Sequence, residues 1–324
     1  MIKKLRGRRT TPQIVVPETR ALAPRPVEHR AASRDVFALE NLLRAWKRVR
    51  ANGGAPGMDG ETLRAFEENL RANLDALQGE LKTGVYQPRG VRMIPVPKAS
   101  GGYRPLTILA VRDRVAQRVV YDALAPVYEQ KFLDCSFGFR EGRSLHDAVA
   151  VVTQHRDEGR KWVVDGDIKD CFERLDHGVL LRALRQDVRD ARLVNLIAKW
   201  LKARVMRDLG RGTAIGTYQG GVISPLLANV YLHAFDVELT RAGLALVRYA
   251  DDWVILSPRK MDAESALERA ARVLERLKLL VNPHKTRIVH FDEGFSFVGM
   301  FFVRNKVYPI SPGARVKDEG ERER

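Results

Sequence analysis

In the first part of the chain, hydrophobic residues recur among polar ones with the spacing of amphipathic helices. Apolar residues three and four positions apart predict a helix from about 36 to 49, at Phe37, Leu39, Leu42, Leu43, Trp46 and Val49. After a Gly-rich loop at 51–60, the same spacing predicts a helix over 63–81 that ends at Gly84. Residues 91–109 predict two strands around a turn. Helices are then expected near 113–132 and 144–158.

From residue 162 onward, short apolar runs typical of strands alternate with helical patterns. A strand is expected at 162–168, followed by helices at 177–187, 191–203 and 224–239. The last of these would begin with Ser224 as its N-cap and Pro225 at its first position. A helix over 263–277 and strands at 286–291, 295–303 and 307–310 complete the order. This order predicts an α+β fold, in which helices pack on an antiparallel sheet.

Two adjacent carboxylates interrupt the most strand-like segment of the chain. Asp251 and Asp252 lie between Leu246–Tyr249 and Trp253–Leu256, which predicts a tight hairpin with two negative charges at its tip. A divalent cation would relieve their repulsion, because Mg²⁺ prefers carboxylate oxygens and keeps positions open for water and phosphates. For the dipeptide alone, a solvated Asp-Asp turn is the favoured explanation, and the rest of the chain has to decide.

Asp167 lies at the end of the apolar strand expected at 162–168. There it would project from the edge of the sheet, although a strand-end Asp is also common as a turn or helix-capping residue. Beside Asp251 and Asp252, it would complete the three carboxylates that phosphoryl transfer with two metal ions requires.

The charge of the chain indicates a polyanionic partner. Its 324 residues include 56 Lys and Arg against 40 Asp and Glu, which gives a formal charge of +16. Nucleic acid is the first candidate, since basic side chains that neutralise phosphates release counterions. The 45% of hydrophobic residues excludes disorder throughout. The two cysteines, Cys135 and Cys171, have no spacing typical of a zinc site or a disulfide framework.

No run of about 20 apolar residues predicts a membrane span, so no membrane partner is expected and the predicted location is cytoplasmic. Residues 1–34 combine prolines with arginines and predict a basic, extended arm.

At this point the chain resembles the reverse transcriptases of the group II intron lineage. The resemblance covers residues near 36–310 and rests on eight blocks in the proper order: Gly57-Met58-Asp59-Gly60, Pro97-Lys98 through Gly102-Tyr103-Arg104-Pro105-Leu106, Cys135-Ser136-Phe137-Gly138-Phe139-Arg140, Asp165-Gly166-Asp167-Ile168-Lys169-Asp170-Cys171-Phe172, Gln219-Gly220-Gly221-Val222-Ile223-Ser224-Pro225-Leu226-Leu227-Ala228-Asn229, Tyr249-Ala250-Asp251-Asp252, His284-Lys285-Thr286 and Phe297-Val298-Gly299-Met300.

The resemblance implies a right-hand polymerase and assigns roles to individual residues. Asp167, Asp251 and Asp252 would be catalytic and would hold two Mg²⁺ ions, or Mn²⁺, together with the carbonyl of Ile168. The nucleotide would be bound by Lys98, Arg104, Ile168, Phe172, Gln219 and Lys285. Phe172 would select deoxynucleotides, because its ring leaves no room for a 2′-hydroxyl. Phe137, Phe139 and Arg140 would line the template path, and Phe297 and Gly299 would grip the primer, although the apolar residues there could equally be core.

The expected division is an arm at 1–34, fingers with an N-terminal helical extension at 35–160, and a palm at 161–310 that includes part of the fingers. Residues 311–324 would be a charged tail or a truncated start of the thumb, so the thumb is expected to be absent or vestigial. Either a partner protein would then supply the clamp on the duplex, for example a CRISPR integrase in a host defence system, or the chain is a truncated or compact member of the family.

Two functions follow from the resemblance. The first is an RNA-directed DNA polymerase, acting on an RNA template, a DNA or RNA primer and deoxynucleoside triphosphates. The second is an RNA-binding, maturase-like scaffold that keeps the fold and polymerises little. The intact carboxylates favour the first, since RNA binding alone does not require them.

Overall fold

The computed structural model describes residues 35–97, 102–205, 215–217 and 220–310. The expected arm and tail, and with them any thumb, lie outside these residues, as do Lys98 and Gln219. Within the described part of the chain, no helix combines the length and apolar character needed to cross a membrane.

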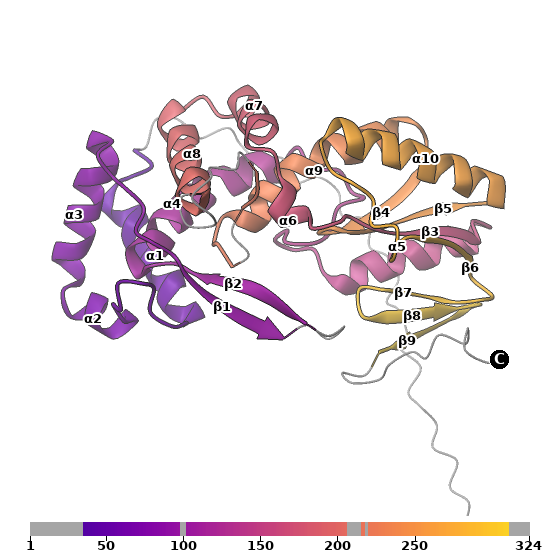
Figure 1. Ribbon diagram of the computed structural model, residues 1–324, viewed down its shortest axis with the longest axis horizontal. Helices are drawn as coiled ribbons and strands as arrows, with labels where there is room; N and C mark the ends of the chain where they lie inside the picture. Colours follow the sequence, from indigo (N-terminus) through magenta and orange to yellow (C-terminus); the bar gives the residue numbers. More distant parts are fainter. Residues whose placement is uncertain (1–34, 98–101, 206–214, 218–219, 311–324) are drawn as a thin grey trace, which may run out of the picture.

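Four helices and a hairpin form the fingers, at one end of the molecule (Figure 1). The helices are α1 (Leu39–Asn52), α2 (Leu63–Glu68), α3 (Leu70–Thr83) and α4 (Val111–Glu129). The single helix expected over 63–81 is interrupted at Asn69, whose φ of −119° is not helical, and Gly84 ends α3 in the left-handed conformation as expected. The hairpin of β1 (Arg92–Pro97) and β2 (Tyr103–Ile108) extends from these helices toward the palm.

The palm is an antiparallel sheet with the strand order β4-β5-β3-β6. Its strands are β3 (Trp162–Asp167), β4 (Ala245–Tyr249), β5 (Asp252–Ser257) and β6 (Arg287–His290). Successive residues face opposite layers, since Val164 packs with α9 (Ser224–Arg241) and α10 (Lys260–Arg276), whereas Val163 packs with α5 (Leu145–Asp157). The α+β fold and its helix-covered antiparallel sheet are therefore confirmed.

A small sheet closes the described chain beneath the palm (Figure 1). It consists of β7 (Phe295–Phe297), β8 (Met300–Val303) and β9 (Lys306–Pro309). The single strand expected over 295–303 is divided by a turn at Val298 and Gly299, both of which have positive φ. Phe295 and Phe302 stack across this turn with ring centroids 5.0 Å apart, so apolar packing folds the segment back on itself.

The segment between β3 and α9 returns to the fingers. It contains α6 (Cys171–Arg174), α7 (His177–Asp187) and α8 (Ala191–Val205). Trp200 of α8 donates to the hydroxyl of Tyr86 at 3.1 Å, and Lys199 donates to the carbonyls of Gly84 and Tyr86 at 2.8 Å. α8 therefore packs on the fingers, as expected for a palm segment that includes part of the fingers, whereas α5 packs on the palm sheet.

The expected N-cap of α9 is also corrected. Ile223 precedes the helix, and Ser224 is its first residue. The Ser224 hydroxyl is buried and lies 3.0 Å from that of Thr217. Ser224 therefore holds α9 to the 215–217 segment instead of capping the helix.

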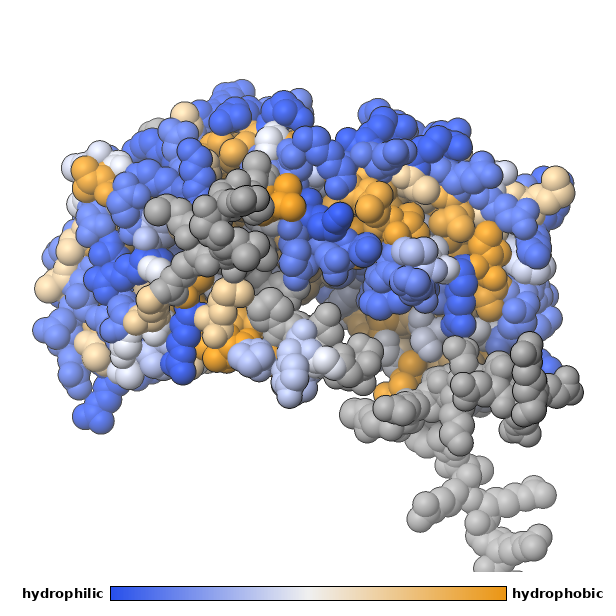
Figure 2. Space-filling view, in the orientation of Figure 1, coloured by the Kyte–Doolittle hydropathy of each residue, from blue (hydrophilic) through white to orange (hydrophobic). Residues whose placement is uncertain are grey.

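Figure 2 shows hydrophilic residues over most of one face, with an apolar band where α10 meets the sheet.

Candidate active site

Asp251 and Asp252 lie at the turn between β4 and β5, where the sequence predicted a hairpin. Tyr249 pairs with Asp252 across this hairpin, so Ala250 and Asp251 form its tip. Ala250 has a φ of 60°, a left-handed conformation that costs a residue with a Cβ about 1–2 kcal/mol. The buried strands on either side keep the tip in place, since Val247 and Trp253 are fully buried.

Asp167 ends β3 directly opposite Asp252 in the register of the sheet. The preceding residue must be glycine, because a Cβ on Gly166 would lie 2.3 Å from the Trp253 ring. Trp253 thus fills the space that a side chain between Asp165 and Asp167 would occupy. The strand pairing brings the three predicted catalytic carboxylates to one edge of the palm sheet.

The three carboxylates influence one another electrostatically. The pKa of Asp252 is raised to about 6, first because surrounding protein displaces water from it and then because Asp251 and Asp167 are negatively charged. Burial also raises the pKa of Asp251, and the charge of Asp167 adds to this effect. Carboxylates that repel one another in this way gain stability from a bound cation.

In the described structure, Asp167 is held by three residues that follow the helix α10. Lys285 Nζ contacts one carboxylate oxygen of Asp167 at 2.8 Å, and Asn282 Nδ2 donates to the other at 2.8 Å. The Asp167 amide donates to the hydroxyl of Thr286 at 3.2 Å, and the Asn282 amide donates to the carbonyl of Asp167 at 2.8 Å. The ion pair with Asp167 raises the pKa of Lys285, which keeps the ammonium charged.

The sequence identified Lys285 but not Asn282. The available signal was the Asn282-Pro283 pair, which favours a turn just before the basic residue. The structure shows that turn, because the amides of Lys285 and Thr286 both donate to the carbonyl of Asn282.

The donor set suits magnesium. Among the described residues, no three His, Cys, Asp or Glu side chains already converge as a metal cage. Mg²⁺ does not require such a cage, since it is usually bound by one or two carboxylates together with waters and substrate phosphates. Asp167, Asp251 and Asp252 supply hard oxygen ligands, and the carbonyl of Ile168 follows Asp167 directly on the chain.

Phe172 and Phe139 meet near this edge. Phe172 follows the β3 end by five residues and is partly buried, with its ring in an edge contact with Phe139 at 6.4 Å between centroids. Phe139 has a φ of 61° and is 48% exposed. Of the three residues assigned to the template path, Phe139 alone presents a large exposed surface.

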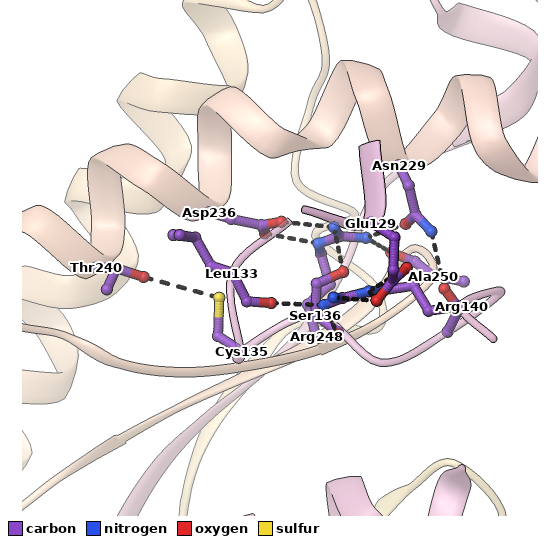
Figure 3. A network of polar contacts seen from close by, with 11 residues as sticks. Glu129, Leu133, Cys135, Ser136, Arg140, Asn229, Asp236, Thr240, Arg248 and Ala250 are labelled. Carbon is purple, nitrogen blue, oxygen red and sulfur yellow. Dashed lines mark hydrogen bonds and ion pairs between the residues drawn. The ribbon is translucent and has the colours of Figure 1, made fainter. Parts of the chain in front are cut away.

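Phe137 and Arg140 require a correction, because both are buried. Phe137 is 2% exposed and belongs to the core beneath the palm sheet. Arg140 binds Glu129 through its guanidinium and donates to the carbonyls of Leu133 and Ser136 at 2.7 Å (Figure 3). Their side chains are already used to hold the loop together, so neither offers a surface on which template bases could stack.

The two residues assigned to the primer differ in the same way. Phe297 is 3% exposed and packs in the core, which favours the core alternative over contact with the primer. Gly299 lies in the exposed turn between β7 and β8, with a φ of 77° and no atom within 4 Å of a Cβ placed on it.

Arg104, which was assigned to nucleotide binding, lies on β2 of the fingers hairpin, opposite Val96.

Comparisons with known proteins agree with this arrangement of strands and carboxylates. Residues 96–302 match the model of the family described as reverse transcriptase (RNA-dependent DNA polymerase). The chain belongs to this family. Within it, the match takes in β2, every strand of the palm sheet and all three carboxylates.

Two curated relatives are similar in sequence. Protein YkfC of Escherichia coli is 35% identical, and the matched region covers 78% of this chain and 76% of YkfC. The group II intron-encoded protein LtrA of Lactococcus lactis is 32% identical over 76% of this chain, but the match covers only 40% of LtrA.

A solved structure of apo telomerase from Candida tropicalis shares the fold. Its TM-score is 0.55 at 12% identity, and the match covers 71% of this chain and 50% of the telomerase chain. The likeness supports the right-hand arrangement of fingers and palm.

Proposed function

We propose that this chain performs RNA-directed DNA synthesis with Asp167, Asp251 and Asp252 as its metal-binding catalytic residues. The observation that carries the proposal is the sheet register, which sets Asp167 opposite Asp252 at the tip of a buried hairpin. Family membership supplies the class of reaction, and this edge supplies the charges that the reaction needs. The similarity to LtrA supports the group II intron lineage for this chain.

Two magnesium ions, when bound, would activate the 3′-hydroxyl of the primer and neutralise the leaving pyrophosphate. The chain's own residues prepare this edge in the absence of metal. Lys285 and Asn282 keep both oxygens of Asp167 hydrogen-bonded, and the Lys285 ammonium offsets its charge. Lys285 is 63% exposed, so its flexible side chain can turn from Asp167 toward a triphosphate.

Phe172 is proposed to exclude ribonucleotides. Its edge contact with Phe139 limits the positions that the ring can take. A fixed ring beside the sugar would exclude the 2′-hydroxyl by its shape. Lys98, Arg104 and Gln219 are proposed to contact the triphosphate and the template, as the resemblance implies.

Replacing Asp251 with Asn tests the catalytic assignment. The change keeps the side-chain volume and removes one charge, so primer extension on RNA should fall by about 10³-fold or more, which corresponds to several kcal/mol of transition-state stabilisation. Binding of the primed RNA should persist, because basic residues carry it. Asp262→Asn, on the exposed surface of α10, is the matched control.

Unchanged extension by Asp251→Asn would contradict the assignment. If the wild-type protein binds RNA tightly and makes no DNA with Mg²⁺ or Mn²⁺, the maturase-like scaffold is favoured instead. The clamp on the duplex, including the CRISPR integrase proposed as its source, stays a prediction that co-purification would test.

A further inference from the structure

A fully buried arginine lies two residues before the tip of the catalytic hairpin. Arg248 is 0% exposed, and all five of its N–H groups have acceptors. Its Nε and one terminal nitrogen bind the two oxygens of Asp236 at 2.7 and 2.6 Å. Asp236 is equally buried, on α9, so the ion pair joins the hairpin to the helix behind it.

The second terminal nitrogen of Arg248 reaches the tip of the hairpin itself. It donates to the carbonyl of Ala250 at 2.8 Å and to the side-chain oxygen of Asn229 at 2.9 Å (Figure 3). The Ala250 carbonyl belongs to the peptide that connects Ala250 to Asp251. A hydrogen bond to that carbonyl therefore fixes the orientation of the peptide plane to which the Cα of Asp251 is attached.

The loop 135–140 packs against the preceding peptide, which connects Tyr249 to Ala250. A Cβ on Gly138 would lie 2.4 Å from the amide nitrogen of Ala250, so these two backbones are in direct contact. Asn229 donates to the carbonyl of Gly138 at 2.8 Å while accepting from Arg248. Ser136 pairs with Arg248 in an isolated parallel β-bridge. The Ser136 hydroxyl also accepts a hydrogen bond from the Arg248 guanidinium at 2.7 Å.

These contacts explain how Ala250 keeps a positive φ although it is not glycine. The left-handed conformation is stabilised by one side-chain hydrogen bond and by one close backbone contact, both from buried groups. Neither Arg248 nor Asn229 is among the residues to which the resemblance assigns a role. The Arg248 guanidinium donates to the side chain of Asn229 and to the carbonyl of Ala250 (Figure 3).

We propose that Arg248 is a positioning residue, which sets the Ala250–Asp251 peptide and thereby aims Asp251 and Asp252 at the metal ions. Asn229 links Arg248 to Gly138 by two hydrogen bonds, and the ion pair with Asp236 holds the guanidinium in place. The inference rests on the proposed function of the carboxylates as metal ligands. Residues that orient metal ligands typically change metal affinity or activity 10–100-fold when replaced.

Two variants separate positioning from simple support of the fold. Arg248→Lys keeps the buried positive charge beside Asp236, but a single ammonium has three donors and lacks the planar fork. The paired change Arg248→Met with Asp236→Leu removes both buried charges together, which proteins often tolerate better than the loss of one partner. Ser136→Ala is the control, since it removes one contact of Arg248 and leaves the contact with Ala250 intact.

The measurements are the melting temperature, Mn²⁺ binding followed by electron paramagnetic resonance, binding of primed RNA, and kcat and KM for a deoxynucleotide. For a folded Arg248 variant we expect Mn²⁺ affinity to fall about tenfold and kcat about 30- to 100-fold. At saturating metal, KM for the nucleotide should stay within about threefold and RNA binding within about twofold, because basic residues outside the hairpin tip are proposed to bind both. Ser136→Ala should lower Mn²⁺ affinity and kcat less than either Arg248 variant, because the contact between Arg248 and Ala250 remains.

Wild-type kcat and Mn²⁺ affinity in either folded Arg248 variant would overturn the proposal. If the paired variant does not fold, Arg248→Lys decides the question by the same two quantities. If the wild-type protein makes no DNA, the proposed function fails, and Mn²⁺ affinity alone then decides whether Arg248 positions the carboxylates.

Discussion

The two hairpins that carry the predicted chemistry differ sharply in burial. In β4–β5, Val247, Trp253 and Val254 are fully buried, and helices cover both faces of the sheet. In β1–β2, exposed and half-buried residues alternate along β1, and Tyr103 of β2 is 70% exposed. The palm hairpin holds Asp251 and Asp252, whereas the fingers hairpin carries Arg104 and leads to Lys98.

This difference matches two chemical tasks. Metal ligands must be held within a fraction of an ångström, and a buried hairpin gives that accuracy. A group that binds triphosphate must open for each new nucleotide, and hairpins with few core contacts have the low local stability that opening requires. Substitutions that disturb the packing of the palm hairpin should therefore damage catalysis and folding, whereas substitutions in the fingers hairpin should affect nucleotide binding alone.

Gly166→Ala should have the largest effect, because the new Cβ would lie 2.3 Å from the Trp253 ring. Overpacking of this kind costs about 1–3 kcal/mol, and displacement of Asp167 should lower primer extension about 100-fold or more. Calorimetry and single-nucleotide extension would measure both. Gly102→Ala, in the fingers hairpin, is the comparison: no atom lies within 4 Å of its Cβ position, so its cost is limited to the strain of a side chain at a φ of 76°. Equal damage by the two changes would remove the contrast between the hairpins.

Arg104→Ala should act on the substrate and leave the fold intact. Loss of a charge-assisted hydrogen bond to a phosphate costs about 1.5–3 kcal/mol, so KM for deoxynucleotides should rise about 10- to 100-fold. The melting temperature should change by less than about 2 °C, which corresponds to under about 1 kcal/mol. Arg92→Ala, exposed on β1 of the same hairpin, serves as the control. A large loss of stability in Arg104→Ala would show that this hairpin is built like the palm hairpin.

Phe172→Val should alter the choice of sugar by opening space beside the ribose. Incorporation of ribonucleotides relative to deoxynucleotides should rise about tenfold, within the range that pocket shape usually supplies. Competition between the two nucleotides in single-step extension measures the ratio. Phe139→Ala should raise it less, since Phe139 contacts the Phe172 ring without replacing it. An unchanged ratio in Phe172→Val would assign Phe172 to the core.

Asp252→Asn should make a small change in stability that depends on pH and metal. Because the folded pKa of Asp252 is about 6, above its ordinary 3.8, its ionisation weakens the metal-free protein as pH rises between about 4 and 6. Asn avoids this loss, so at pH 7 without metal the variant should melt about 1–3 °C higher. The difference in melting temperature between the variant and the wild type should disappear below about pH 4. Addition of Mn²⁺ should stabilise only the wild type. A variant that melts lower than wild type at pH 7 without metal would contradict this assignment.

The sequence predicted the elements whose patterns are local. The apolar runs on both sides of Asp251-Asp252 and before Asp167 identified the catalytic strands, because strand-forming residues concentrate there. It did not predict the breaks at Asn69 and at Val298. The turn at Val298 accompanies the stacking of Phe295 on Phe302, a contact that the periodicity of the segment does not reveal.

The errors at the site have a similar cause. Aromatic and arginine residues are common on nucleic-acid surfaces, and this suggested the template role of Phe137 and Arg140. Their burial depends on Glu129 and on the core beneath the sheet, which no local pattern reveals. Asn282 was missed because its partner Asp167 lies 115 residues away.

The path of α8 bears on how this enzyme could be re-engineered. Because α5 belongs to the palm and the later α8 rests on the fingers through Trp200 and Tyr86, the chain passes between the two lobes more than once. Cutting at residue 160 would give two fragments that each lack part of their packing. To give this chain the fingers of another polymerase, residues 35–130 and residues 177–205 would have to be replaced together.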